Sequence, residues 1–359
     1  MADLTALPVV DAAAPDEAAM QPRPGRLRRW LGTLLSIGLS GLFLYFAMRK
    51  VDLAEVRQAL ASANLFWLAP MLLISLINFW LRAVRWAWVF PPSTRPKVHQ
   101  AFSVFMIGAL TNNIAPGRLG DIARAGLIGR LMPPIGASGA LATVVLEKVM
   151  DGLVLLALLG VAFLLAPLPA WLGQIGALGA VIFLGMLLVL FVLNVYGKAD
   201  GMRSNVIIQH SRPGLVTSAV QGLLSRFAGG LNALSNKRQF IILLALTSPI
   251  WLLDISIMFI TFQAFSLALP FVAAMVTMVL LCMGMMIPAA PGFIGTYQFF
   301  VITGLQIYHV PRSQALAMAV FLNLFVFAIS TLVGLLALSV KGIGWLLPMV
   351  PRGIPGGAE

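Results

Sequence analysis

"NNIAPGRLGDIARAGLIGR", residues 112–130, interrupts a chain that is otherwise mostly aliphatic. The stretch holds three arginines and one aspartate between two hydrophobic runs, and Pro116 and Gly117 break it near its start. Proline cannot continue a helix, and glycine relaxes the turn that follows. The stretch therefore predicts a helix break followed by a short, charged amphipathic helix over 118–129.

The composition of the chain predicts a membrane protein. Of 359 residues, 60% are hydrophobic and 10% are charged, and the mean hydropathy is +0.96. A water-soluble globular domain would not tolerate this composition on its surface. We expect an all-α polytopic membrane protein with about eight hydrophobic segments, each near the length that crosses a bilayer as a helix. These segments are 30–48, 65–90, 98–115, 138–166, 171–196, 239–265, 268–290 and 313–340.

Charges near the chain ends predict the domain limits and the orientation. The first 22 residues contain four acids and no Lys or Arg, whereas Arg26, Arg28 and Arg29 directly precede the first segment. The positive-inside rule then places the N-terminus in the cytoplasm, and we expect a bacterial inner (plasma) membrane location. The predicted parts are a disordered tail (1–28), a membrane domain (29–344) and a short C-terminal tail (345–359).

The excess of 24 basic over 12 acidic residues fits lipid headgroups better than nucleic acid, because most basic residues flank apolar segments. We therefore expect no nucleic-acid partner. The single cysteine, Cys282, and three scattered histidines predict no metal site and no cofactor.

The Pro-Gly break occurs twice. "IAPGRLGD" (114–121) reappears as "AAPGFIGT" (289–296), and the same offset of 175 residues carries "ALATVV" (140–145) onto "ALAMAV" (315–320). We therefore predict pseudo-repeats at about 65–166 and 240–341. Keeping the basic segments cytoplasmic requires two re-entrant hairpins that enter from opposite sides, which makes the repeat inverted. The predicted hairpin-forming residues are Pro116, Gly117, Gly120, Pro291, Gly292 and Gly295.

The first hairpin carries the candidate headgroup site. At 100° per residue, Arg118, Asp121 and Arg124 fall on one helix face, so two guanidiniums lie near a helix N-terminus, where a phosphate group binds well. Asp121 would fix an arginine rotamer, and Asn113 lies just before the break. The alternative is a solvated interfacial face. In the second hairpin the charges are absent, which leaves Tyr297 and Gln298 as candidate polar groups.

Acidic residues inside apolar runs need partners. Glu147 and Asp151 are four residues apart on one helix face, with Lys148 three residues before Asp151. We expect partners among Arg82, Arg85 and Arg124, and two roles stay open for the acids: proton coupling or counter-ions for arginines. Asp254 is either a partner for a cation of the other half or a second coupling site.

Two of these arginines have a simpler interpretation. Arg82 and Arg85 stand beside Trp86 and Trp88 at the end of the second segment. Snorkelling side chains within an aromatic belt would explain them without any function.

These motifs resemble a known family. "NNIAPGRLGDIAR", "LATVVLEKVMD" and "APGFIGTYQ" look like the membrane domain of the lysylphosphatidylglycerol synthase/flippases and of stand-alone flippase-like proteins, over about residues 30–340. The resemblance implies two hairpins that meet in a central cavity, and transfer of a phospholipid or polyprenyl-phosphate lipid between leaflets. One departure is Gln298, where the family often has glutamate. The implied site holds Asn113, Pro116, Arg118, Gly120, Asp121, Arg124, Glu147, Asp151, Pro291, Gly292 and Gly295.

The leading hypothesis is a non-enzymatic translocator of an anionic, phosphate-bearing lipid. Because we recognise no aminoacyl-transferase domain in the sequence, we do not expect the chain to make lysyl-lipid. The alternatives are an integral-membrane transferase or phosphatase that uses Glu147 and Asp151 on a lipid-linked substrate, and an accessory subunit of envelope-lipid assembly. A homo-oligomer or a lipid-biosynthesis partner stays open.

Overall fold

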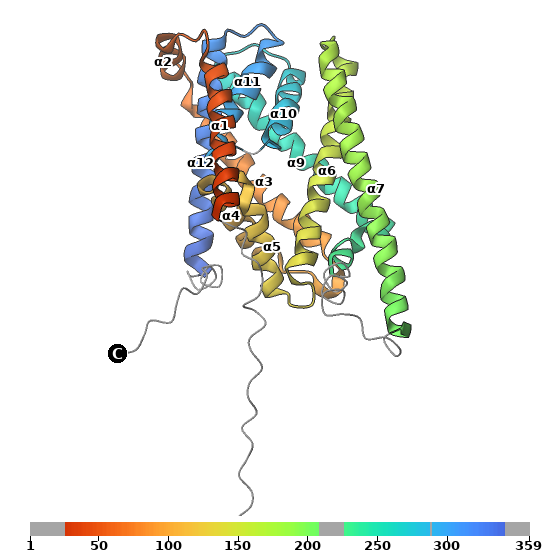
Figure 1. Cartoon of the computed structure of the whole chain (residues 1–359). Helices are drawn as coiled ribbons and strands as arrows, with labels where there is room; N and C mark the ends of the chain where they lie inside the picture. The colour runs from red at the N-terminus through yellow and green to blue at the C-terminus, as the bar shows by residue number, and fades with distance from the viewer. Residues whose placement is uncertain (1–25, 208–225, 288, 342–359) are drawn as a thin grey trace, which may run out of the picture.

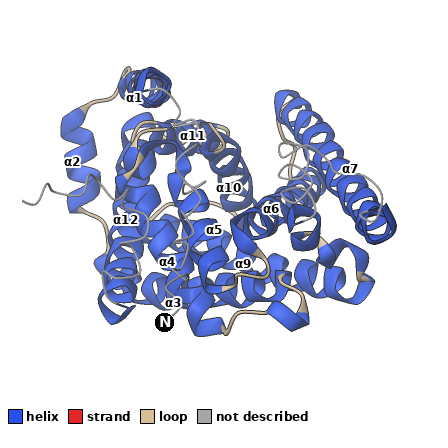
Figure 2. Cartoon of the chain, turned by 60° about the horizontal axis from the view of Figure 1, so that its bottom comes forward, coloured by secondary structure: helices blue, strands red, loops and turns tan. Residues whose placement is uncertain are grey.

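The computed structural model describes residues 26–207, 226–287 and 289–341, and these ranges contain helices and loops but no strand (Figure 1, Figure 2). The predicted all-α class is confirmed. The predicted tails 1–28 and 345–359 lie almost wholly outside the described residues. The helices are α1 (Arg26–Met48), α2 (Leu53–Ala61), α3 (Leu68–Val89), α4 (Val98–Ile114), α5 (Leu119–Leu131), α6 (Gly136–Leu165), α7 (Ala170–Ile207), α9 (Lys237–Ala264), α10 (Phe271–Met285), α11 (Thr296–Gln306) and α12 (Arg312–Lys341).

All eight apolar segments predicted from the sequence are helical, but they differ in length. Within the described ranges, five helices are long and apolar enough to cross a membrane, and α1 with α2 would form a sixth span bent by 86°. α4 has 17 residues and α10 has 15. At about 1.5 Å per residue, these two helices are shorter than the roughly 30 Å of bilayer hydrocarbon. The chain is a multi-pass membrane protein in which two apolar helices are too short to span the hydrocarbon unaided.

The same order of elements occurs twice. A long helix, a short helix, a Pro-Gly 3-10 turn, a second short helix and a long helix follow one another as α3–α4–η4–α5–α6, and again as α9–α10–η6–α11–α12. The turns are η4 (Pro116–Arg118) and η6 (Pro291–Phe293). In Figure 1, α4 and α5 lie in the lower half of the bundle and α10 and α11 in the upper half.

The two sets of helices pack against each other in a reciprocal pattern. α3 lies along α9, α4 lies along α12, and α10 lies along α6. In the repeated order of elements, α4 corresponds to α10 and α6 corresponds to α12. The contact between α4 and α12 is therefore the counterpart of the contact between α10 and α6. α2 and α7 lie at opposite edges of this bundle (Figure 2).

Left-handed backbone residues shape both Pro-Gly turns. In the first turn Arg118 has φ 59°, and in the second Gly292, Phe293 and Gly295 have φ 66°, 58° and 91°. A residue with a Cβ costs roughly 1–2 kcal/mol in this region, so Arg118 and Phe293 are strained. Pro116 and Gly117 both lie in the first turn, but the residue with the left-handed backbone there is Arg118.

A close approach between α4 and α5 requires glycine. The Gly120 amide donates a hydrogen bond to Asn112 Oδ1 over 2.7 Å. A Cβ at Gly120 would collide with the Gly108 carbonyl oxygen and lie 2.6 Å from that Asn112 oxygen. The neighbouring helix backbones can therefore approach only because neither position carries a side chain.

Gly120→Ala is expected to lower the free energy of unfolding by about 1–3 kcal/mol, because the new methyl group has no space between the two backbones. The measurement is thermal unfolding of the detergent-solubilised protein, followed by intrinsic fluorescence. Gly160→Ala is the matched control, since nothing lies within 4 Å of a Cβ built at Gly160. Equal melting temperatures for the two variants would contradict the predicted close contact.

Candidate functional site

A network of buried ion pairs begins on α6, where Glu147 and Asp151 lie one turn apart. Arg85 of α3 forms salt bridges with both carboxylates, at 3.2 Å for Arg85 Nη2 to Glu147 Oε1. Arg85 also donates to Thr247 Oγ1 over 3.2 Å, and Trp251 Nε1 donates to Asp151 Oδ1 over 3.1 Å. Only 1% of Arg85 is exposed. The network therefore joins α3, α6 and α9.

Arg124 of α5 binds the other side of Glu147. Its Nη1 and Nη2 donate to the two carboxylate oxygens over 3.1 and 3.2 Å, and Nη2 lies 3.1 Å from Asp121 Oδ1. The guanidinium lies 5.1 Å from the ring centre of Trp86 and 5.4 Å from that of Phe105. Only 2% of Arg124 is exposed, so its charge faces protein groups on every side.

The network ends at two cations that reach the surface. Arg118 Nε lies 4.0 Å and Lys148 Nζ lies 3.8 Å from the Asp121 carboxylate, and 29% and 37% of the two side chains are exposed. Arg118 Nη1 donates to the Met285 carbonyl over 3.2 Å, and its guanidinium lies 5.8 Å from the Phe293 ring. Arg118 thus connects the first Pro-Gly turn with the second.

The charges in this network do not cancel. Its cations are Arg85, Arg118, Arg124 and Lys148, and its carboxylates are Asp121, Glu147 and Asp151. One positive charge is left over at the exposed end, where Arg118 and Lys148 share Asp121. In the described ranges no group of three or more His, Cys, Asp or Glu side chains could hold a metal ion.

A separate pair joins α3 to α9. Arg82 and Asp254 form a salt bridge in which 17% and 21% of the side chains are exposed. Asn78 accepts a hydrogen bond from Arg82 Nε over 2.7 Å and donates to Asp254 Oδ1 over 3.0 Å. Asn78 also donates to the Ile250 carbonyl over 2.9 Å. This pair is balanced, with one charge of each sign.

Asn113 at the end of α4 faces α12. Its amide nitrogen donates to Ser330 Oγ over 2.8 Å and to Thr331 Oγ1 over 2.9 Å. The Phe327 carbonyl is a third acceptor at 3.3 Å. The amide therefore attaches the first broken helix to α12.

The polar side chains of the second break stabilise their own turn. Gln298 Oε1 accepts the Gly295 amide over 2.7 Å, and Gln298 Nε2 donates to Asn323 Oδ1 over 3.4 Å. Asn323 Nδ2 donates to the Gly292 carbonyl over 3.1 Å. Tyr297 is buried in the core. These contacts connect η6 and α11 to α12.

Comparison with known families agrees with this arrangement. Residues 33–334 match the family described as "Lysylphosphatidylglycerol synthase TM region". The chain belongs to this family. The resemblance found in the motifs is thereby confirmed, and the membership indicates a membrane protein of lipid metabolism or translocation. Comparisons with curated proteins and with solved structures found no match.

For this family member, the structure decides among several predicted ion-pair partners. Glu147 pairs with Arg85 and Arg124, and Asp151 pairs with Arg85, as predicted. Asp254 forms a salt bridge with Arg82 of α3, and its alternative role as a second coupling site stays a prediction. The headgroup-binding role of Asn113, Arg118, Asp121 and Arg124 stays a prediction.

One interpretation from the sequence was wrong. Arg85 does not snorkel, because it is buried against two carboxylates. Lys148, for which we predicted no partner, approaches Asp121 of α5. The signal for Arg85 was present in the sequence, since two acids on one face of a buried helix need two cations. Nothing in the sequence indicated the position of Lys148, which depends on how α5 packs against α6.

Asp254→Asn is expected to lower the free energy of unfolding by about 1–3 kcal/mol, since it leaves Arg82 without a counter-charge at a partly buried position. Combining it with Arg82→Gln should recover part of that loss, because no unpaired charge then stays behind. Thermal unfolding in detergent measures both effects. Glu55→Gln, at an exposed acid of α2, is the matched control, and strictly additive losses in the double variant would refute the coupling.

Proposed function

We propose that this protein moves a lipid with an anionic, phosphate-bearing headgroup between the two leaflets of its membrane. The observation that carries the proposal is the uncompensated positive charge at Arg118 and Lys148, beside the point where the two Pro-Gly turns meet. Membership of a lipid-related membrane family supports it. A phosphate at this place would complete the charge balance of the network.

The proposal includes an inverted repeat with two re-entrant hairpins, α4–α5 and α10–α11. Three observations support this topology: the shortness of α4 and α10, the repeated order of elements, and the reciprocal contacts α4–α12 and α10–α6. Broken helices at membrane depth are stable where protein or a polar cavity satisfies their free backbone groups. We place the N-terminus of α1 and the basic loops on the cytoplasmic side of a bacterial inner membrane.

Within the predicted headgroup site we assign different roles to the two arginines. Arg118 is partly exposed, its Nε lies 4.0 Å from a carboxylate oxygen of Asp121, and that Nε has no hydrogen-bond acceptor. Arg124 is buried and held by Glu147 and Asp121. A guanidinium binds a phosphate by directed hydrogen bonds, so Arg118, assisted by Lys148, receives the headgroup. Arg124 and Asp121 hold Arg118 and Lys148 in place.

The contacts of Glu147 and Asp151 also bear on the two roles left open for these acids. Each carboxylate accepts hydrogen bonds from a buried arginine, which supports the counter-ion role over proton coupling. The same pairing counts against the alternative of a transferase or phosphatase, because neither carboxylate is free to act as a general base on a substrate.

The double variant Arg118→Gln/Lys148→Gln is expected to slow lipid transfer about tenfold or more, because it removes the cations that we assign to the headgroup. The measurement is leaflet exchange of fluorescent phosphatidylglycerol in reconstituted vesicles, read by quenching from outside. Arg238→Gln, at an exposed arginine of α9, is the control and should transfer lipid at the wild-type rate. Wild-type transfer by a correctly folded double variant would end the proposal.

Corresponding loops of the two halves are expected to label from opposite sides of the membrane. Ser93, between α3 and α4, and Ser266, between α9 and α10, are both exposed. In a Cys282→Ser background, Ser266→Cys should react with a membrane-impermeant maleimide in right-side-out vesicles. Ser93→Cys should react only after the vesicles are opened. Labelling of both positions from one side would contradict the inverted topology.

A further inference from the structure

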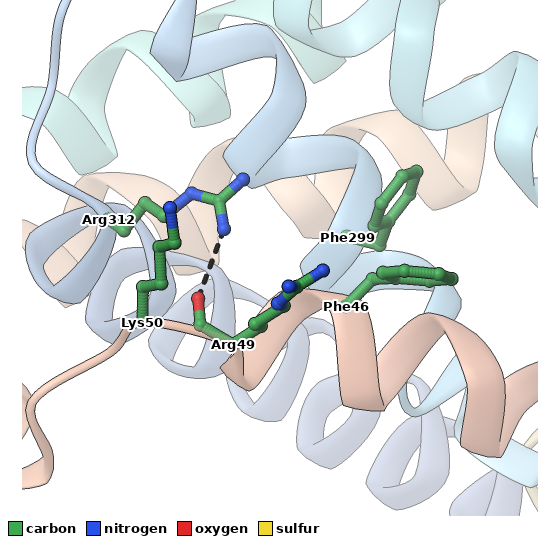
Figure 3. A pocket seen from close by; sticks show the side chains of 5 residues that line it. All are labelled: Phe46, Arg49, Lys50, Phe299 and Arg312. Carbon is green, nitrogen blue, oxygen red and sulfur yellow. Dashed lines mark hydrogen bonds between the residues drawn. The ribbon is translucent and has the colours of Figure 1, made fainter.

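A second basic region lies outside the Arg118–Lys148 network. A pocket of about 440 Å³ opens where α1 ends and α12 begins, and its lining residues are Phe46, Arg49, Lys50, Phe299 and Arg312 (Figure 3). This volume lies within the usual range for small-ligand sites, roughly 300–1,000 Å³. The pocket is at the end of the bundle where α1 leads into α2, whereas the α5–α6 connection lies at the opposite end (Figure 1).

Three cations and no acid line this pocket. In the described part of the chain, no salt bridge involves Arg49, Lys50 or Arg312. The nearest acid in sequence, Asp52, accepts the Ala54 amide over 2.7 Å and so caps α2. The three positive groups therefore repel one another without compensation from a carboxylate.

Neutral acceptors, rather than a carboxylate, hold the Arg312 guanidinium in the pocket. Arg49 and Lys50 follow the C-terminal end of α1, where the helix dipole favours cations, and this alone would explain them. Arg312 is instead the first residue of α12, a helix of 30 residues, where the dipole favours anions. Its Nη1 donates to the Arg49 carbonyl over 3.0 Å and its Nη2 to Gln306 Oε1 over 3.3 Å. These bonds hold the guanidinium beside the two other cations.

The opposite wall of the pocket is aromatic. Phe46 and Phe299 lie on one side, and Lys50 and Arg312 lie on the other (Figure 3). The two rings are 6.5 Å apart between centroids, and 40% of Phe46 is exposed. A pocket with cations on one side and an apolar wall on the other suits a molecule that carries both an anionic group and hydrocarbon.

We propose that Arg49, Lys50 and Arg312 form a second phosphate-binding site, which takes the phosphate of a lipid headgroup while Phe46 and Phe299 contact the glycerol and upper acyl region. Phe299 belongs to α11, so this site adjoins the second broken pair as Arg118 adjoins the first. The role of the site in transport rests on the proposed function, whereas binding itself does not.

The test measures binding rather than transport. Delipidated protein in neutral detergent is titrated with dioleoyl phosphatidylglycerol and examined by native mass spectrometry, in an Arg118→Gln/Lys148→Gln background that removes both cations of the first site. Arg49→Gln/Lys50→Gln is expected to weaken lipid binding about thirtyfold, as for the loss of two basic residues near a membrane surface. Arg312 is not substituted in this variant, because its hydrogen bond to the Arg49 carbonyl also connects α12 to the end of α1.

Two comparisons make the result decisive. Arg57→Gln removes an exposed cation of α2 outside the pocket and should bind lipid as the Arg118→Gln/Lys148→Gln parent does. A second titration uses glycerol 3-phosphate, which has the phosphate but no acyl chains. Tighter binding of the lipid than of glycerol 3-phosphate supports the aromatic wall as part of the site. Binding of glycerol 3-phosphate without binding of the lipid would overturn the lipid assignment.

Unchanged binding of both ligands in Arg49→Gln/Lys50→Gln would overturn the site altogether. The proposed function is tested by a different measurement, the rate of lipid transfer in vesicles by the wild-type protein and by its Arg118→Gln/Lys148→Gln variant. The binding site and the proposed function can therefore fail independently of each other.

Discussion

Two arginines buried in the centre of the bundle determine which helices must stay together. Moving a charged group out of water costs several kcal/mol per ion even after the protein relaxes. Arg85 and Arg124 both bind Glu147, so separation of α3, α5 or α6 would leave a buried charge unpaired. Thr247 and Trp251 bring α9 into the same network. Apolar packing fills the remaining space, but any helix arrangement that breaks these pairs is excluded by its electrostatic cost.

The same network explains why its exposed end lies at a helix break. A continuous helix would satisfy its own backbone groups and allow the side chains of α5 to pack as an ordinary apolar surface. The break at Pro116 instead places Arg118 in a left-handed conformation beside the second turn. Its guanidinium is then held by a backbone carbonyl and an aromatic ring rather than by a carboxylate of its own. The surplus charge is thus located where the backbone is irregular and partly open.

Sequence patterns predicted the helices well and the site only in part. The apolar runs matched the helices, because a membrane imposes a long hydrophobic segment for each crossing. Helical spacing also placed Arg118, Asp121 and Arg124 on one face, which the salt bridges confirm. Pairs between helices, such as Lys148 with Asp121, could not be predicted because spacing describes one helix at a time. The basic pocket was missed for the same reason, since Arg49 and Arg312 are 263 residues apart.

Partial neutralisation fits the transport that we propose, because transport requires release of the bound headgroup. Four unpaired cations in a low-dielectric setting would hold a phosphate too tightly for it to leave, and a neutral network would not attract it. Three carboxylates reduce the surplus to one charge, so the headgroup meets attraction without a deep trap, a balance that conducting pores also need. The reciprocal contacts α4–α12 and α10–α6 give the two broken pairs equivalent surroundings.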